Sequence, residues 1–67
     1  MLILVNGKQR EIPSNLSIAQ LLESLRIENQ NTAIEYNGQF LEPGADLAPV
    51  ILKDGDSLEI VRFVGGG

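Results

Sequence analysis

The sequence has no cysteine and no histidine among its 67 residues. Without cysteine there is no disulfide, no thiolate nucleophile and no thiolate metal ligand. Without histidine the commonest general base and zinc ligand is missing as well. An enzyme that works with its own catalytic groups is therefore the least favoured functional class. A chain this short also leaves little interior for a ligand, so we expect no bound cofactor and no metal site.

Positive charge is scarce too. Five Lys and Arg residues stand against nine Asp and Glu residues, which gives a net charge of -4. Binding to a phosphate backbone rewards clustered Lys and Arg, and these five residues are scattered along the sequence. We therefore expect no nucleic acid among the partners.

Long apolar runs are also lacking. The first apolar stretch, residues 2–5, is far shorter than the core of a signal peptide or a membrane span. This pattern favours a cytoplasmic protein with no membrane association, and we assume a monomer.

Two Asn-Gly pairs predict two β-hairpins. The first separates residues 1–5 from residues 8–12, and the second separates residues 33–36 from residues 39–41. Asn-Gly is favoured in the tight turns of hairpins because both central residues of a type I′ turn have positive φ.

Residues 17–26 predict one amphipathic helix between the hairpins. Ser17 and Gln20 have the spacing of a capping box at its start. The apolar residues that follow recur at i, i+3, i+4 and i+7, so they form one stripe: Ile18, Leu21, Leu22 and Leu25. We expect a helix of about ten residues whose apolar stripe covers a sheet.

The longest β-type run, residues 57–64, follows a turn at residues 53–56. That turn contains Asp54 and Asp56, which have a spacing found in cation-binding loops. The Asp-Gly pair at its centre is typical of a hairpin turn, and we therefore interpret the segment as the turn that leads into the last strand.

The order of elements is hairpin, helix, short hairpin and long last strand. Residues 1–5 are apolar throughout and residues 57–64 are mostly apolar, which is typical of strands with a neighbour on each side. Placing these two strands side by side and parallel requires a crossover, which the helix provides. We therefore predict an α+β fold of the β-grasp, or ubiquitin-like, type, with one helix across one face of a mixed four- to five-stranded sheet. This domain spans residues 1–64, and residues 65–67 form a flexible C-terminal glycine tail.

Alternation along the two central strands predicts an exposed apolar patch beside that tail. When Ile3 and Leu58 face the helix, the residues next to them face away from it. A cluster of exposed apolar side chains suggests a docking site for a partner, and incidental exposure is the alternative. The candidate docking residues are Leu2, Leu4, Glu35, Val61, Arg62 and Phe63. Among them, the two charged residues would meet charged groups of the partner.

The sequence ends in three glycines, Gly65, Gly66 and Gly67. A segment without Cβ atoms is narrow enough to lie extended in a channel that excludes larger residues, and three extended residues reach about 10 Å. The reactive group of this segment is the carboxylate of Gly67. A cloning remnant and an unimportant frayed end are the alternatives to this functional interpretation.

Five segments occur together in this one short chain: MLILVNG at the start, SIAQLLESL in the helix, IEYNGQFL in the second hairpin, LKDGDSLEIV before the last strand and FVGGG at the end. Together they resemble the sulfur carrier proteins of thiamine biosynthesis, the ThiS family. The resemblance covers the whole chain. A Gly-Gly end and an Asp-Gly-Asp turn recur across ubiquitin-like proteins, whereas their joint spacing in so short a chain is more specific.

The resemblance implies a role for Gly67. A ubiquitin-activating-like adenylyltransferase would use ATP and Mg²⁺ to adenylate its carboxylate, and sulfur from a cysteine desulfurase pathway would convert the adenylate to a thiocarboxylate. Thiazole synthase would then take the sulfur for the thiazole of thiamine. All catalytic groups would belong to the partners, in agreement with the missing Cys and His.

Two alternatives stay open at this point. The small subunit of molybdopterin synthase is a sulfur carrier with the same tail chemistry, usually in a longer chain. A ubiquitin-like binding module that is never conjugated would have the same fold and incidental glycines. Such a module would keep its full partner affinity after removal of residues 65–67.

Overall fold

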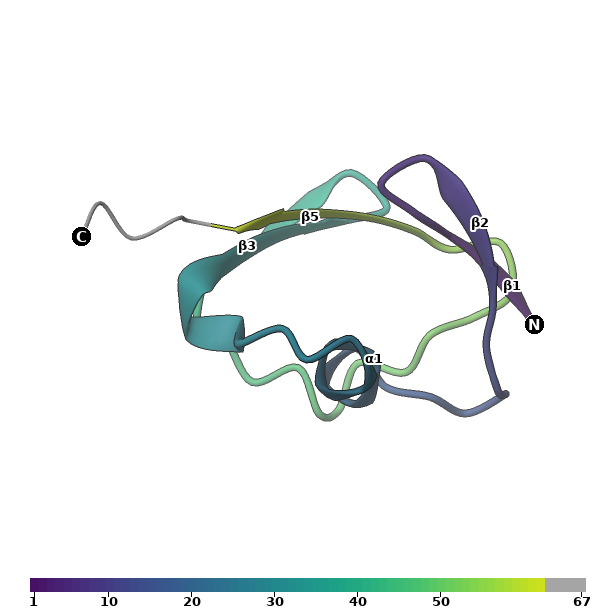
Figure 1. The fold of residues 1–67 in the computed structure, drawn as a ribbon, viewed down its shortest axis with the longest axis horizontal. Coiled ribbons are helices and arrows are strands. Elements are labelled where there is room, and N and C mark those ends of the chain that lie inside the picture. The colour runs from purple at the N-terminus through teal and green to yellow at the C-terminus, as the bar shows by residue number, and fades with distance from the viewer. Residues whose placement is uncertain (63–67) are drawn as a thin grey trace.

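The computed structural model of the protein describes residues 1–62, and residues 63–67 lie outside the described part. Within the described part, one α-helix lies across one face of a five-stranded sheet (Figure 1). The elements in chain order are β1 (Leu2–Val5), β2 (Lys8–Glu11), α1 (Ile18–Ser24), the 3-10 turn η1 (Asn29–Asn31), β3 (Thr32–Tyr36), β4 (Gln39–Leu41) and β5 (Ser57–Arg62).

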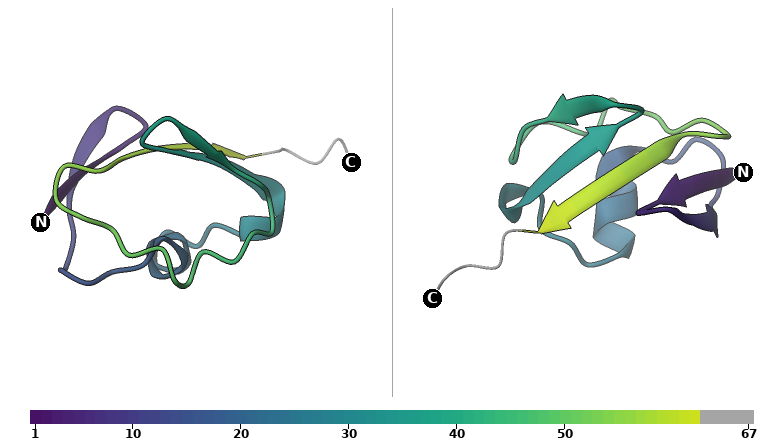
Figure 2. Two further views of the ribbon diagram at one scale, coloured as in Figure 1. Left: turned by 180° about the vertical axis from the view of Figure 1, so that it is seen from behind. Right: turned by 90° about the horizontal axis from the view of Figure 1, so that it is seen from above.

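The sheet has the strand order β2-β1-β5-β3-β4. The central strands β1 and β5 are parallel, and the other neighbours are antiparallel. Figure 2 shows that α1 crosses under the sheet at an angle to β5. The predicted β-grasp arrangement is confirmed, with the last strand at the centre and the polar β2 at an edge. The predicted boundary between domain and tail, at residue 64, lies outside the described residues.

Both predicted hairpin turns are present. Asn6 and Gly7 have φ angles of 52° and 80°, and Asn37 and Gly38 have φ angles of 49° and 87°. These positive φ angles are those that a type I′ turn requires, and Asn and Gly adopt them at low cost. The sequence therefore specifies both hairpins locally.

Asn6 also extends the pairing of β1 with β5 beyond the end of β1. The backbone N–H of Ile60 donates to Asn6 Oδ1 at 2.6 Å, and Asn6 Nδ2 donates to the Ile60 carbonyl at 3.3 Å. The backbone N–H of Asn6 donates to the Leu58 carbonyl at 2.8 Å. The side-chain amide of Asn6 thus takes the place of a neighbouring strand and pairs with the backbone N–H and carbonyl of Ile60, close to the C-terminal end of β5.

The predicted capping box opens α1. The N–H of Gln20 donates to Ser17 Oγ at 3.1 Å, and the N–H of Ser17 donates to Gln20 Oε1 at 2.9 Å. Ile18, Leu21 and Leu22 are buried, so the predicted apolar stripe does face the sheet. These two features fix where the helix begins and which side it buries.

The helix has seven residues, fewer than the ten or so predicted. Arg26 ends it by adopting a φ of 58°, in the left-handed region. Its N–H donates to the Glu23 carbonyl at 3.0 Å, and the N–H of Ile27 donates to the Leu22 carbonyl at 2.9 Å. This pair of bonds is the Schellman motif, in which glycine usually occupies the position that Arg26 holds.

The core lies between α1 and the sheet. Leu47, on the long connection from β4 to β5, is only 3% exposed and fills the core from that loop. Leu52 N–H donates to the Leu16 carbonyl at 2.8 Å, which ties the same connection to the start of the helix. The buried apolar residues are Ile3, Val5, Ile12, Ile18, Leu21, Leu22, Ile34, Leu47, Leu52, Leu58 and Ile60.

Candidate functional site

The face of the sheet that turns away from α1 carries no covering element among residues 1–62, and we call it the open face (Figure 1). Its strands present four large apolar side chains to solvent: Leu2 is 47% exposed, Leu4 38%, Phe40 63% and Val61 56%. Exposed apolar side chains gathered on one face of a small domain are typical of a docking surface. Leu2, Leu4, Glu35, Phe40, Glu59 and Val61 define the open face.

The strand register sets the order of these residues across the sheet. Glu35 of β3 lies opposite Glu59 of β5 and, on its other side, opposite Phe40 of β4. Leu4 pairs with Ser57, two positions before Glu59, and Val61 lies two positions after it. The open face therefore consists of apolar side chains on both sides of an acidic pair.

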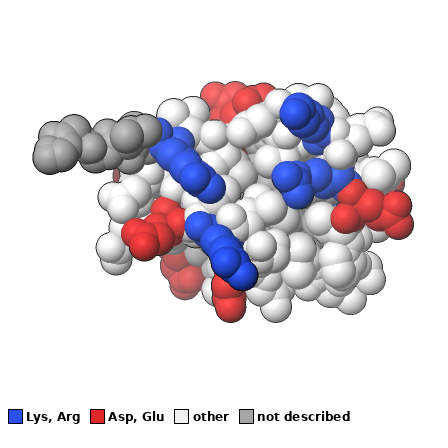
Figure 3. Space-filling view, in the orientation of Figure 1, with Lys and Arg blue, Asp and Glu red and all other residues white. Residues whose placement is uncertain are grey.

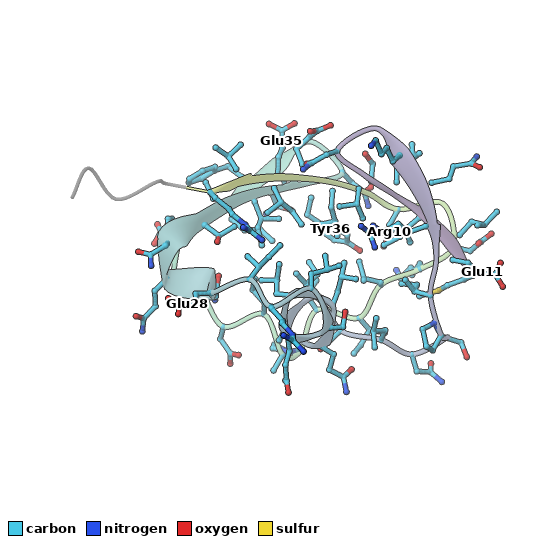
Figure 4. The ribbon with its side chains drawn as sticks, viewed as in Figure 1. Arg10, Glu11, Glu28, Glu35 and Tyr36 are labelled. Carbon is cyan, nitrogen blue, oxygen red and sulfur yellow. The ribbon has the colours of Figure 1, made fainter. Side chains whose placement is uncertain are left out.

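Glu35 and Glu59 are exposed and directly opposite on antiparallel strands. Figure 4 shows that Glu35 points away from the helix side of the sheet. Like charges in such a pair repel and destabilise the sheet slightly. A Lys or Arg side chain of a partner placed between the two carboxylates would relieve the repulsion. The predicted contact of Glu35 with a cationic side chain of a partner would therefore include the carboxylate of Glu59 as well.

Phe40 and Glu59 are part of the open face, and the sequence interpretation did not include them. A signal for Phe40 was present: with a two-residue turn at Asn37-Gly38, the hairpin register places it opposite Glu35. Glu59 follows from the same alternation that identifies Val61. The register between β3 and β5 is a nonlocal property, and it places Glu59 on the other side of Glu35 from Phe40.

The structure separates Arg62 from the predicted docking face. Arg62 pairs with Thr32, which is 1% exposed, so its side chain leaves the sheet on the helix side. There it lines a hollow with Arg10 and Ile27. Grouping Arg62 with Val61 was wrong because adjacent residues of a strand face opposite sides.

The other predicted site residues lie outside the described part of the chain. These are Phe63 of the docking set and the three tail residues, Gly65, Gly66 and Gly67. Their roles stay predictions.

Asp56 anchors the turn that starts β5. Its carboxylate accepts hydrogen bonds from the Tyr36 hydroxyl at 2.6 Å, the Lys53 N–H at 2.8 Å and Asn37 Nδ2 at 3.1 Å. Nearby, Asp54 Oδ1 accepts from the Leu2 N–H at 2.7 Å. Both carboxylates therefore bind donors of the protein, as expected of turn residues. Within residues 1–62, no group of three His, Cys, Asp or Glu side chains is arranged to hold a metal ion.

The hydrogen bond between Tyr36 and Asp56 shifts the pKa of both side chains. The hydrogen bond to Asp56 raises the pKa of Tyr36 to about 12, and burial and the negative charge of Asp56 act in the same direction. Burial raises the pKa of Asp56, but the hydrogen bonds from Tyr36, the Lys53 backbone and Asn37 outweigh it, and the pKa is lowered overall. The phenol therefore stays protonated and keeps donating to the carboxylate until strongly alkaline pH.

We predict that this contact makes the fold sensitive to alkali. Between a pH of about 10 and about 12 the unfolded state loses the Tyr36 proton while the folded state retains it, so the free energy of unfolding falls with rising pH. Since Tyr36 is the one tyrosine of the chain, phenolate absorbance reports this group directly. The expected midpoint in the folded protein is about 12.

The control variant is Asp56→Asn, which removes the negative charge from beside the phenol. Its Tyr36 midpoint should move back toward the ordinary tyrosine value of about 10. Tyr36→Phe should lower the free energy of unfolding by about 2 kcal/mol at neutral pH, because it removes a hydrogen bond to a charged group. A midpoint near 10 in the unmodified chain would contradict the prediction.

The part of the chain that the structure describes contains no helix with the length and hydropathy needed to span a membrane.

Comparison with known proteins identifies the relatives of this fold. The crystal structure of thiamine biosynthesis protein ThiS from Geobacter metallireducens is 34% identical, with a TM-score of 0.80 over the full length of both chains. The solution structure of a thiamine biosynthesis protein from the same organism is 33% identical, with a TM-score of 0.76, over 100% of this chain and 88% of that one.

A curated relative extends the comparison to a longer protein. The thiazole synthase of Paramagnetospirillum magneticum is 36% identical over 67 residues, and the chain spans 20% of that relative's length. The family model described as the ThiS family matches residues 3–67. This chain therefore belongs to the ThiS family, the sulfur carriers of thiamine biosynthesis.

Proposed function

We propose that the chain carries sulfur as a thiocarboxylate on Gly67. A carboxylate is a poor electrophile, so it must first be activated. A ubiquitin-activating-like adenylyltransferase would use ATP and Mg²⁺, and the Gly67 carboxylate oxygen attacks the α-phosphorus and releases pyrophosphate. The acyl adenylate that forms is a mixed anhydride with AMP as its leaving group.

Sulfur enters in the second step. The terminal sulfur of a persulfide, supplied by a cysteine desulfurase pathway, attacks the Gly67 carbonyl carbon and displaces AMP. A thiol then breaks the sulfur–sulfur bond of the product, forms a disulfide with the departing sulfur and leaves the thiocarboxylate. Thiocarboxylate sulfur is a better nucleophile than carboxylate oxygen and can be transferred to an acceptor.

The chain contributes no catalytic group of its own in this proposal, and it binds no cofactor. The absence of Cys and His from the sequence supports the proposal that the partners supply the catalytic groups. We propose that the chain acts as a protein co-substrate, and that it works in the cytoplasm.

We propose that the open face is where the partners hold the carrier. The support is its geometry: Leu4 and Val61 are exposed on the two central strands, and β5 ends at Arg62, five residues before Gly67. Five extended residues span at most about 17 Å. A partner seated on this face is thus within reach of the terminal carboxylate.

Thiazole synthase is the proposed sulfur acceptor. The support is the curated thiazole synthase from P. magneticum, in which a segment is 36% identical to the whole of this chain. Joining a carrier and its acceptor in one polypeptide raises their effective concentration and favours transfer between them.

The observation that carries the proposal is the family match across residues 3–67, which includes the glycines at the end. The test is mass spectrometry of the intact chain after incubation with the cognate adenylyltransferase, ATP, Mg²⁺ and a persulfide donor. We expect the mass of one oxygen-to-sulfur exchange on the C-terminal peptide. An unchanged mass, with an enzyme that releases pyrophosphate from another carrier, would sink the proposal.

A further inference from the structure

All three arginines of the sequence gather on the helix side of the molecule, although they are far apart in the chain. Arg10 on β2 pairs with the buried Ile3, and Arg62 on β5 pairs with the buried Thr32, so both side chains leave the sheet toward α1. Arg26 directly follows the C-terminal cap of α1. Figure 3 shows several Lys and Arg side chains spread over the visible face of the molecule, with acidic side chains among them.

These arginines line two adjoining hollows. The first has a volume of about 360 Å³, and its lining includes Arg10 and Arg62 as well as Leu25 and Ile27. The second, of about 210 Å³, is lined by Arg26 and again by Ile27 and Arg62. We call the two together the arginine groove. Figure 4 shows Arg10 on the helix side of the sheet, opposite in direction to Glu35.

The charge of the groove contrasts with that of the rest of the chain. The protein carries a net charge of -4, and three of its five cations line this one surface. Among residues 1–62, one carboxylate lines the groove, that of Glu28 in the second hollow, and it accepts a hydrogen bond from Asn31 Nδ2 at 3.3 Å. Three guanidinium groups against one carboxylate leave the groove positively charged.

The backbone of Arg26 supplies a second, independent observation. Four residues other than glycine have positive φ within the described part, and three of them are asparagine. Arg26 is the fourth, at the position of the helix end where glycine is usual. An arginine held in the left-handed region costs stability. The Arg26 side chain lines the groove, so an arginine stands at a position where glycine would be less strained and its guanidinium group reaches this surface.

We propose that the arginine groove binds an acidic segment of the adenylyltransferase that activates Gly67. Guanidinium groups pair with carboxylates through two parallel hydrogen bonds. Leu25 and Ile27, which also line the groove, would contact apolar side chains of a peptide segment, whereas a nucleotide phosphate has no apolar group to place there. The enzyme would then hold the end of β5 from both faces of the sheet.

This inference rests on the proposed function for the identity of the partner. The test measures the affinity of the adenylyltransferase for the full chain by calorimetry, at low and at high salt. The variants are Arg10→Gln and Arg62→Gln. The matched control is Lys53→Gln, which removes the same charge from outside the groove. We expect about tenfold weaker binding for each arginine variant and a change of less than about twofold for the control.

Salt provides a second measurement. Wild-type affinity should fall more steeply with salt than the affinity of the arginine variants, because screening weakens exposed ion pairs. Arginine variants that bind as tightly as the Lys53→Gln control would overturn the proposal. A raised KM for ATP together with unchanged carrier affinity would also overturn it, because the groove would then bind nucleotide phosphate.

Arg26→Gly separates binding from folding. Glycine relieves the left-handed strain, so the melting temperature should rise by about 4 °C while binding of the enzyme weakens about tenfold. A lower melting temperature with unchanged binding would assign Arg26 to the fold alone and contradict the proposal.

Thiocarboxylate formation by the wild-type chain distinguishes the two proposals. When the wild-type chain forms the thiocarboxylate and the arginine variants bind the enzyme normally, only the proposed binding at the arginine groove is contradicted. When binding depends on the arginines but no thiocarboxylate forms, only the proposed chemistry fails. A wild-type chain that does not bind the enzyme at all overturns both.

Discussion

Deleting Gly67 is expected to slow thiocarboxylate formation more than 100-fold, roughly to the limit of detection. The deletion withdraws the terminal carboxylate by about 3.5 Å, the length of one extended residue. A displacement of even about 1 Å can cost a factor of 100 when a reacting group must meet a fixed site. The measurement is intact-mass spectrometry over time with the adenylyltransferase, ATP and a persulfide donor.

The matched control for tail length is Gly65→Ala. This variant keeps the number of residues and the terminal Gly-Gly pair. We expect it to be modified at a rate within a few-fold of the wild type, because the added methyl group lies before the pair that is delivered. Both variants should melt at the wild-type temperature, since the core residues of the described part, residues 1–62, all precede residue 61. Full modification of the chain that lacks Gly67 would contradict the prediction, because the reaction would then not depend on the length of the tail.

Leu58→Ala is expected to lower the free energy of unfolding by about 3 kcal/mol. Leu58 is completely buried in β5, between β1 and β3. The substitution removes buried methyl groups and leaves a cavity against the helix. A domain of this size has a stability on the order of 5 kcal/mol, so most of it would be lost. Urea unfolding followed by circular dichroism measures the change.

Val61→Ala is the control on the same strand. Its side chain is 56% exposed on the open face, and its removal should cost less than about 1 kcal/mol. The same variant should bind the adenylyltransferase more weakly, because Val61 belongs to the proposed docking surface. Equal destabilisation by the two substitutions would contradict the assignment of the two faces of β5.

The local features of the fold could be predicted from the sequence because each depends on a few neighbouring residues. Asn6-Gly7 and Asn37-Gly38 specify their turns through positive φ. Ser17 and Gln20 specify the start of the helix through reciprocal hydrogen bonds. The end of the helix was placed too late because an arginine in the left-handed region has no sequence signature.

The candidate site could be predicted only in part. Alternation along β1 and β5 correctly assigned Leu2, Leu4 and Val61 to the open face. Arg62 was assigned to the wrong face because its neighbours in sequence were read as one surface. Phe40 and Glu59 were missed because their place beside Glu35 depends on how three strands pair.

The sequence by itself determined the order of the elements and the central place of the last strand, since turn residues and apolar periodicity are local properties. The family followed from the resemblance of five segments of the sequence to the ThiS family. The tertiary structure alone decided which distant side chains share a surface. Residues 10, 26 and 62 lie on three separate elements, and only the strand register and the end of α1 bring their guanidinium groups to one groove. The physical reason is that strand pairing and helix packing join residues that are far apart in the chain, at positions that no local pattern specifies.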